Sequence, residues 1–225
     1  MNEMIEPQTF AQRREQILEE IAKAAKAVGR NKDDIILVAA CKTQPNEIIE
    51  EAIASGQLVF GENRVHEGQG HFENRDKSSL ELRMIGPVQS KKAEEAVALF
   101  DVIETLDRES LAQAIAKAQN KLGKKIKLLV QVNIGDEEQK SGIEVKELPQ
   151  FLDLCKNKYE LEISGLMCVP PADEPAGPYF ALLQKLAKRH NLKELSMGMS
   201  GDFKIAIQFG ATHIRIGTAL FGARN

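Results

Sequence analysis

Short apolar runs alternate along the chain with longer segments in which apolar residues recur at the spacing of an amphipathic helix. The apolar runs have the length of buried strands. They predict strands over Ile35–Ala40, Leu58–Phe60, Leu82–Ile85, Val102–Glu104, Leu128–Ile134, Leu161–Met167, Glu194–Met197 and His213–Ile216. The intervening segments predict helices over Pro45–Ser55, Arg64–Glu73, Lys91–Phe100, Glu109–Leu122, Val145–Asn157, Gly177–His190 and Asp202–Phe209. A short turn is expected after the last strand, over Thr218–Phe221.

Strict alternation of strands and helices predicts parallel strands joined by right-handed crossovers. Eight such units in 225 residues favour an α/β fold of one domain, a single (β/α)8 TIM barrel over residues 1–225. Thr9 and Gln12 have the spacing of a capping box and Gly29 marks a helix end. An additional N-terminal helix is therefore expected at the floor or side of the barrel. The alternative, an open doubly wound sheet, lacks a Gly-x-Gly-x-x-Gly motif after its first strand.

The bulk properties narrow the function classes. The net charge of −3 does not indicate a nucleic-acid-binding protein, and no apolar run approaches the roughly 20 residues that a membrane helix needs. Residues 1–14 lack the apolar core of a signal peptide, so a cytoplasmic protein is expected. Cys41, Cys155 and Cys168 are odd in number and have no paired spacing, which argues against a disulfide framework and a zinc site. They are interpreted as small buried residues.

Lys42 follows the first predicted strand, separated from it only by Cys41. This places an amine at the carboxyl end of a buried parallel strand, where α/β folds keep their catalytic and binding groups. Lysine is costly to bury, and its amine can condense with an aldehyde once its pKa falls well below the free value of about 10.4. The alternative is a lysine whose stem packs while its ammonium reaches water. On position alone, both interpretations stay open.

Glycine and small polar residues recur after nearly every predicted strand, and the last two of these loops carry the clearest pattern. Ser200 and Gly201 precede the seventh helix, and Asp202 is expected to cap it. Gly217 and Thr218 open the final short helix. Two helix N-termini would then meet at the last strands, where barrels often bind phosphate. A simple capped turn is the alternative for the second of these loops.

Arg215 lies within the eighth strand between Ile214 and Ile216. Period-two alternation puts Arg215 on the face opposite the isoleucines, so it points into the barrel if they pack against the helices. A buried guanidinium needs an acceptor, which either a structural salt bridge or a ligand can supply. A ligand with a lysine-reactive aldehyde, a phosphate and an acceptor on a ring would satisfy Lys42, the two loops and Arg215 together. Pyridoxal 5′-phosphate (PLP) has all three groups.

Seven segments carry a resemblance to a known family. Between Leu37 and Gly222 they read, in order, LVAACKTQP, FGENRVHE, IGPVQSKK, QVNIGDEEQKSGI, GLMCVPP, LSMGMSGD and HIRIGTALFG. With these segments the sequence resembles the YggS/PROSC family of pyridoxal phosphate homeostasis proteins, which are relatives of the alanine racemase barrel domain. The resemblance covers nearly the whole chain and implies a fold-type III barrel.

The same resemblance implies that PLP is held as a Schiff base on Lys42. It further implies phosphate binding by Ser200, Gly217 and Thr218, a place facing the pyridine nitrogen for Arg215, and ring contacts for Asn63 and Met167. The sequence departs from the family pattern at Pro87 and Lys91, where the family usually has His and Asn, so no role is transferred to these two positions. Cys41 replaces the usual Ser, but strand alternation points it away from Lys42.

An arginine at the pyridine nitrogen bears on whether the chain is an enzyme. Its charge disfavours protonation of that nitrogen, which makes PLP a weaker electron sink but remains compatible with proton exchange at an α-carbon. A racemase needs an acid–base group on each face of its substrate. Lys42 can serve one face, whereas the related racemases supply the second group from a further domain and this chain ends at Asn225.

No second acid–base group is expected within the barrel. Tyr159 and Tyr179 fall on outer helices or loops. His66 and His71 are expected to be solvated on the second helix, and His213 to lie one layer below the arginine of its strand.

The chain is therefore expected to be a PLP homeostasis protein without established catalytic turnover, a monomer that passes PLP to recipient apo-enzymes. A low-activity amino-acid racemase is the first alternative, and a Schiff-base aldolase acting on a phosphosugar ranks below it. Lys140, in the KSGI segment near the barrel mouth, is either a solvated loop lysine or a second, transient contact for the aldehyde.

Overall fold

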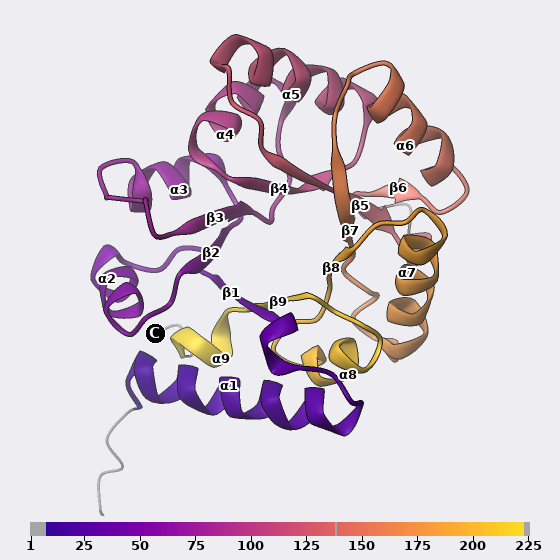
Figure 1. Cartoon of the computed structure of the whole chain (residues 1–225). Coiled ribbons are helices and arrows are strands. Elements are labelled where there is room, and N and C mark those ends of the chain that lie inside the picture. Colours follow the sequence, from indigo (N-terminus) through magenta and orange to yellow (C-terminus); the bar gives the residue numbers. More distant parts are fainter. Residues whose placement is uncertain (1–7, 138, 223–225) are drawn as a thin grey trace, which may run out of the picture.

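The computed structural model describes residues 8–137 and 139–222, which form a barrel of parallel strands surrounded by helices (Figure 1). The sheet runs in the order β4-β3-β2-β1-β9-β8-β7-β5, and pairing of β4 with β5 closes it. The eight strands of this barrel are β1 (Ile36–Ala40), β2 (Val59–Glu62), β3 (Glu81–Met84), β4 (Val102–Leu106), β5 (Lys127–Asn133), β7 (Ile163–Met167), β8 (Glu194–Ser196) and β9 (His213–Ile216). The predicted (β/α)8 fold is confirmed, and each predicted strand overlaps an observed one.

A ninth strand, β6 (Ile143–Glu144), was not predicted. It runs parallel to the carboxyl end of β5, where Val132 pairs with Ile143 and Asn133 with Glu144. Two residues are too few to show either a period of two or an apolar run, so the sequence holds no pattern for this strand.

The helices stand in a ring outside the sheet (Figure 1). They are α2 (Asn46–Ala54), α3 (Val65–Phe72), α4 (Ala93–Leu99), α5 (Glu109–Leu122), α6 (Leu148–Asn157), α7 (Gly177–Arg189), α8 (Phe203–Gln208) and α9 (Thr218–Phe221), with 3-10 turns over Lys32–Asp34 and Ser90–Lys92. The bounds of α5 agree with the prediction, because Gly123 adopts a left-handed φ of 62° and ends it. No helix within the described ranges has both the length and the apolar composition to cross a membrane.

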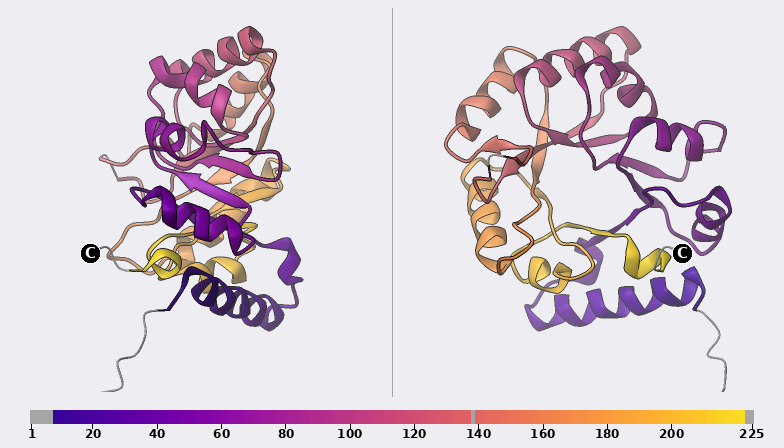
Figure 2. Two further views of the ribbon diagram at one scale, coloured as in Figure 1. Left: turned by 90° about the vertical axis from the view of Figure 1, so that its left-hand side faces the viewer. Right: turned by 180° about the vertical axis from the view of Figure 1, so that it is seen from behind.

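Helix α1 (Phe10–Ala27) lies along the outer side of the barrel against α8 and α9, as two directions of view agree (Figures 1 and 2). Its predicted start is confirmed, since the side chain of Thr9 accepts from the Gln12 amide while the Gln12 side chain accepts from the Thr9 amide. The rings of Phe10 and Phe221 lie 5.1 Å apart, which joins the first helix to the last. Of the two predicted places, floor or side, the helix therefore takes the side.

The protein has one apolar core outside the sheet and a charged centre inside it. Most buried apolar residues form a single cluster between the strands and the helices. Inside the barrel, Val102, Leu129 and Met167 form a small apolar cluster. The remaining interior holds ionic side chains, of which Arg83 and Glu104 are 0% exposed and joined by a contact of 2.5 Å between Nε and Oε1. This buried ion pair was not predicted.

Candidate functional site

Lys42 lies just beyond the carboxyl end of β1, and its side chain reaches the loop after β9. Parallel pairing sets Ala39 beside Ile216, so the residues that follow these two strands are neighbours. A Cβ atom placed on Gly217 would lie 3.8 Å from Cε of Lys42 and 3.3 Å from the carbonyl oxygen of Ala40. The lysine and the glycine of the last loop, far apart in sequence, are thus brought together as the predicted site requires.

The backbone of Lys42 is in an unusual conformation. Its φ of 52° lies in the left-handed region, which costs a residue with a Cβ atom about 1–2 kcal/mol. Such conformations persist where the surrounding structure holds them, and they cluster at functional sites. The strained residue here is the lysine that is predicted to bind the cofactor.

Arg215 points into the barrel. Ile214 and Ile216 belong to the outer apolar cluster, so the alternation predicted for β9 is confirmed. The arginine is 5% exposed. Its Nη1 donates to Oγ of Ser196 at 2.7 Å and its Nη2 donates to the carbonyl of Cys168 at 2.8 Å. These two acceptors fix the plane of the guanidinium beneath the strand ends.

A buried network supports this arginine from below. Glu104 accepts from Nε of Arg83 and from Oγ of Ser196, each at 2.5 Å, and its Oε2 lies 4.0 Å from Nη1 of Arg215. Burial alone would raise the pKa of Glu104, but the two guanidinium groups outweigh it and lower the pKa. Arg83 also contacts Glu81 and lies 3.5 Å from Glu194. Glu104 is therefore ionised at neutral pH between the guanidinium groups of Arg83 and Arg215.

Sequence reasoning overlooked Arg83 and Glu104, although a signal was available for the arginine. Arg83 lies between Leu82 and Met84 within a predicted strand, the pattern from which the inward direction of Arg215 was inferred, whereas Glu104 ends its predicted strand and is followed by Thr105. His213 lies deeper in the barrel, as predicted, with Nε2 3.8 Å from Oε2 of Glu194. Burial, reinforced by the positive charge of Arg83, lowers the pKa of His213 to about 3, so this imidazole is neutral.

The loops after β8 and β9 meet beside this arginine. The amide of Arg215 donates to the carbonyl of Gly198 at 3.0 Å, which ties the β8 loop to β9. Gly198 has a φ of 95°, and a Cβ atom there would lie 2.6 Å from Cβ of Ala206. Ser200 and Thr218 are exposed at the surface of these loops. That they bind a phosphate stays a prediction.

The predicted capping of α8 by Asp202 is wrong. Asp202 stands at the N-cap position, but its side chain caps no amide of the helix. Its carboxylate accepts instead from the amide of Met199 at 2.6 Å, so it closes the loop that contains Ser200. An aspartate can bond either forward to a helix or back to its own turn, and the sequence alone does not distinguish the two.

A cavity of about 960 Å³ opens at the barrel mouth over the carboxyl ends of β2, β3, β4, β5 and β7, and Lys42, Ser200, Arg215 and Gly217 are not among the residues that line it. It contains two predicted ring contacts, Asn63 and Met167. Gly86 packs under Asn63 so closely that a Cβ atom on it would lie 2.1 Å from the Asn63 carbonyl oxygen. The cavity is lined by Asn63, Arg64, Val65, His66, Ile85, Gly86, Pro87, Val88, Gln89, Lys92, Asp107, Arg108, Gln131, Ser141, Met167 and Val169.

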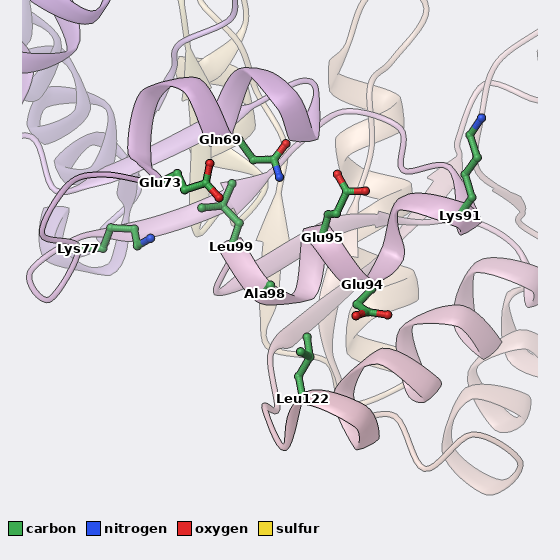
Figure 3. A pocket seen from close by; sticks show the side chains of 9 residues that line it. All are labelled: Gln69, Glu73, Lys77, Lys91, Glu94, Glu95, Ala98, Leu99 and Leu122. Atoms are coloured by element: carbon green, nitrogen blue, oxygen red, sulfur yellow. The ribbon is translucent and has the colours of Figure 1, made fainter.

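A smaller hollow of about 430 Å³ lies outside the barrel, between α3, α4 and α5 (Figure 3). Its rim is charged, and its members Glu94 and Glu95 pair with neighbouring lysines. Lys91, one of the two positions that depart from the family pattern, lies here and not at the barrel mouth (Figure 3). The hollow is therefore separate from the candidate site.

The structure also places the two tyrosines, Lys140 and the three cysteines that the sequence singled out. Tyr159 and Tyr179 bond to Glu109 and Glu174 on the outside of the barrel, as predicted. Nζ of Lys140 lies 2.5 Å from Oε2 of Glu137 and donates to the Pro170 carbonyl at 3.2 Å, and the side chain is 31% exposed. Whether it contacts an aldehyde stays a prediction. The three cysteines are free and buried, which confirms their interpretation.

His71 contradicts its expectation. Its side chain is 10% exposed, and its Nδ1 lies 2.7 Å from Oε1 of Glu62. Its Nε2 donates to the carbonyl of Gln44 at 2.8 Å. The helical pattern of α3 places His71 on a side that seemed polar, but the charged partner that draws it inward comes from β2 and cannot be read from that pattern. Within the described residues, no three His, Cys, Asp or Glu side chains gather as a metal ion would need.

The chain is similar to known proteins over nearly its whole length. Residues 14–225 match the model of a family described as the N-terminal domain of alanine racemase. The chain belongs to this family. A pyridoxal phosphate homeostasis protein of Aquifex aeolicus is 38% identical over 222 residues, which cover 95% of this chain and 97% of the relative. The family resemblance inferred from the seven motifs is thereby confirmed.

Two solved structures extend the comparison. PipY of Synechococcus elongatus, solved with PLP bound, is 34% identical, has a TM-score of 0.76 and matches 90% of this chain and 100% of its own. An alanine racemase of Clostridium difficile has a TM-score of 0.68 at 14% identity and matches 92% of this chain but 56% of its own. The second likeness shows the shared barrel fold.

Proposed function

We propose that this protein binds PLP and serves in PLP homeostasis, with the cofactor held as a Schiff base on Lys42. The observation that carries the proposal is the close approach of the Lys42 side chain to Gly217 at the junction of β1 and β9, two residues after the buried Arg215. Support also comes from a relative named as a PLP homeostasis protein and from PipY, which has been solved with PLP bound.

The residues present suit each part of the cofactor. PLP supplies an aldehyde, which condenses with a lysine amine to form a C=N bond and release one water molecule. Gly217 has no side chain to block the approach of a ligand to its backbone. The hydroxyls of Ser200 and Thr218 are exposed and free to donate to a phosphate. Arg215 would face the ring nitrogen, while Asn63 and Met167 would contact the ring.

We further propose that the protein has no substantial catalytic turnover. The charge of Arg215 opposes protonation of a ring nitrogen beside it. Tyr159, Tyr179 and His213 do not supply a second acid–base group. The two tyrosines lie outside the barrel, and His213 is neutral and deeply buried. The proposal includes a single PLP-binding domain over residues 1–225, a cytoplasmic monomer and transfer of PLP to apo-enzymes.

The decisive experiment is a visible absorption spectrum of the purified protein with added PLP. The wild type should develop the band of a PLP–lysine Schiff base, and Lys42→Ala should not. Lys140→Ala is the matched control, because it removes a second lysine near the mouth whose amine is held by Glu137. Borohydride reduction followed by peptide mass analysis should place the adduct on Lys42. A band of normal intensity in Lys42→Ala would overturn the proposal.

A low-activity amino-acid racemase is the second candidate, favoured by the shared fold of alanine racemase. Exchange of solvent deuterium into the α-carbon of alanine or serine measures this activity directly. Turnover above about 1 s⁻¹, near the ordinary range of enzymes, would establish catalysis and displace the homeostasis proposal. A phosphosugar aldolase would instead give a borohydride adduct with the mass of its sugar.

A further inference from the structure

The turn that carries Lys42 is held from two sides. From β2, the carbonyl of Gly61 accepts from the amide of Cys41 at 2.9 Å. From α3, Nε2 of His71 donates to the carbonyl of Gln44 at 2.8 Å. Between these two anchors lies Lys42 with its left-handed φ of 52°. Because that conformation is intrinsically unfavourable, it depends on the anchors at both ends of the turn.

The second anchor depends on a proton. The Gln44 carbonyl can only accept, so Nε2 of His71 must carry a hydrogen. The 2.7 Å contact between Nδ1 and Oε1 of Glu62 requires one more proton, placed on either the imidazole or the carboxyl group. If that proton leaves, the Nδ1 lone pair faces a carboxylate at hydrogen-bond distance, and the two repel. The geometry of the turn is thus coupled to the proton shared by the pair.

The surroundings favour retention of this proton. The hydrogen bond to Glu62 raises the pKa of His71 against the opposing effect of burial, and burial raises the pKa of Glu62. Three other groups face the pair. Glu67, on α3, adds negative charge, the buried Cys41 thiol lies against Glu62, and Nε of Arg75 donates to the His71 carbonyl at 2.5 Å. Glu67 favours retention of the proton, whereas the Cys41 thiol, as a hydrogen-bond donor, lowers the pKa of Glu62 without overcoming the effect of burial.

We propose that His71 is a positioning residue that holds Lys42 in its left-handed conformation through the proton it shares with Glu62. His71 does not touch the ligand site. It acts on the lysine through the Gln44 carbonyl, and so sets how readily the amine meets an aldehyde. The effect on PLP rests on the proposed function, whereas the effect on the turn does not.

Two measurements test the positioning role. Hydrogen–deuterium exchange of residues 41–46, measured without PLP, should rise about tenfold in His71→Ala, the factor that the loss of one good hydrogen bond gives. The rate at which the Schiff-base band forms with PLP should fall by a similar factor. His190→Ala is the control, because His190 lies beside Ile163 at the start of β7, near the opposite end of the barrel. It should change neither rate.

The pH profile separates positioning from mere packing. His71→Gln can still donate to the Gln44 carbonyl but does not titrate, so it should restore part of the loading rate at neutral pH. The ratio of the wild-type rate to the His71→Gln rate should then fall as pH rises through the elevated pKa of His71. A ratio that stays constant, or unchanged exchange in His71→Ala, would overturn the proposal. Failure of the wild type to form any band would count against PLP binding alone, since the exchange result stands without PLP.

Discussion

Replacing Glu104 with Gln tests the charged centre of the barrel. The substitution keeps the shape of the side chain and removes its charge. Glu104 is 0% exposed and contacts Arg83 and Ser196 at 2.5 Å. Without it, Arg83 retains only its contacts with Glu81 and Glu194, and Arg215 has no other carboxylate within 4.0 Å in the described part of the chain.

The expected loss is large because an unpaired buried charge is costly. Removing one partner of a buried ion pair typically lowers the free energy of unfolding by about 3–5 kcal/mol. Domains are stabilised by only about 5–15 kcal/mol in total, so the variant should lose a large share of its stability. The matched control is Glu94→Gln, which breaks an exposed pair with Lys121 and should cost about 1 kcal/mol or less.

Urea denaturation followed by far-ultraviolet circular dichroism measures both variants. The pKa of Glu104 is lowered in the folded protein, so its charge contributes stability above the unfolded pKa of about 4.3. That contribution is lost as pH falls through the folded value, and the difference between wild type and Glu104→Gln should shrink there. The reasoning would be refuted if Glu104→Gln lost less than about 1 kcal/mol of unfolding free energy at pH 7 while the dependence of that free energy on urea concentration stayed unchanged.

Two further predictions concern stability. His213 has a folded pKa of about 3, so between about pH 6.5 and 3 the unfolded chain binds the extra proton and stability falls with falling pH. In His213→Asn this dependence should weaken by up to about 1.4 kcal/mol per pH unit, as urea midpoints at pH 4 and 6 will show. Gly86→Ala should lower the free energy of unfolding by about 1–3 kcal/mol, because its new Cβ would meet the Asn63 carbonyl oxygen. Amide hydrogen exchange around Asn63 should become faster. Gly70→Ala, inside α3 with open space around it, should instead gain about 0.5–1 kcal/mol, and equal losses in both would contradict the packing argument.

The fold was predictable because the strands of a parallel barrel are buried on both faces. They therefore read as short apolar runs, and all eight were found from sequence. Helix α5 was predicted to the residue because Gly123 ends it in a conformation that suits glycine. The short strand β6 has no such signature.

The candidate site was predictable only in part. The neighbourhood of Lys42 and Gly217 follows from barrel topology, since the first and last strands must pair to close the sheet. The His71–Glu62 contact was missed because it joins a helix to a strand through their side chains, and no periodicity encodes such a contact. Asp202 was misread because a turn and a helix cap use the same residue type.

The pairing of β1 with β9 also has a consequence for biosynthesis. Of the barrel strands, β1 leaves the ribosome first and β9 last, and they carry Lys42 and Gly217 to their meeting point. Until β9 has emerged, the nascent chain displays a lysine with no opposing loop. If a ligand needs both sides, as proposed for PLP, it can be held only after translation of the barrel is complete.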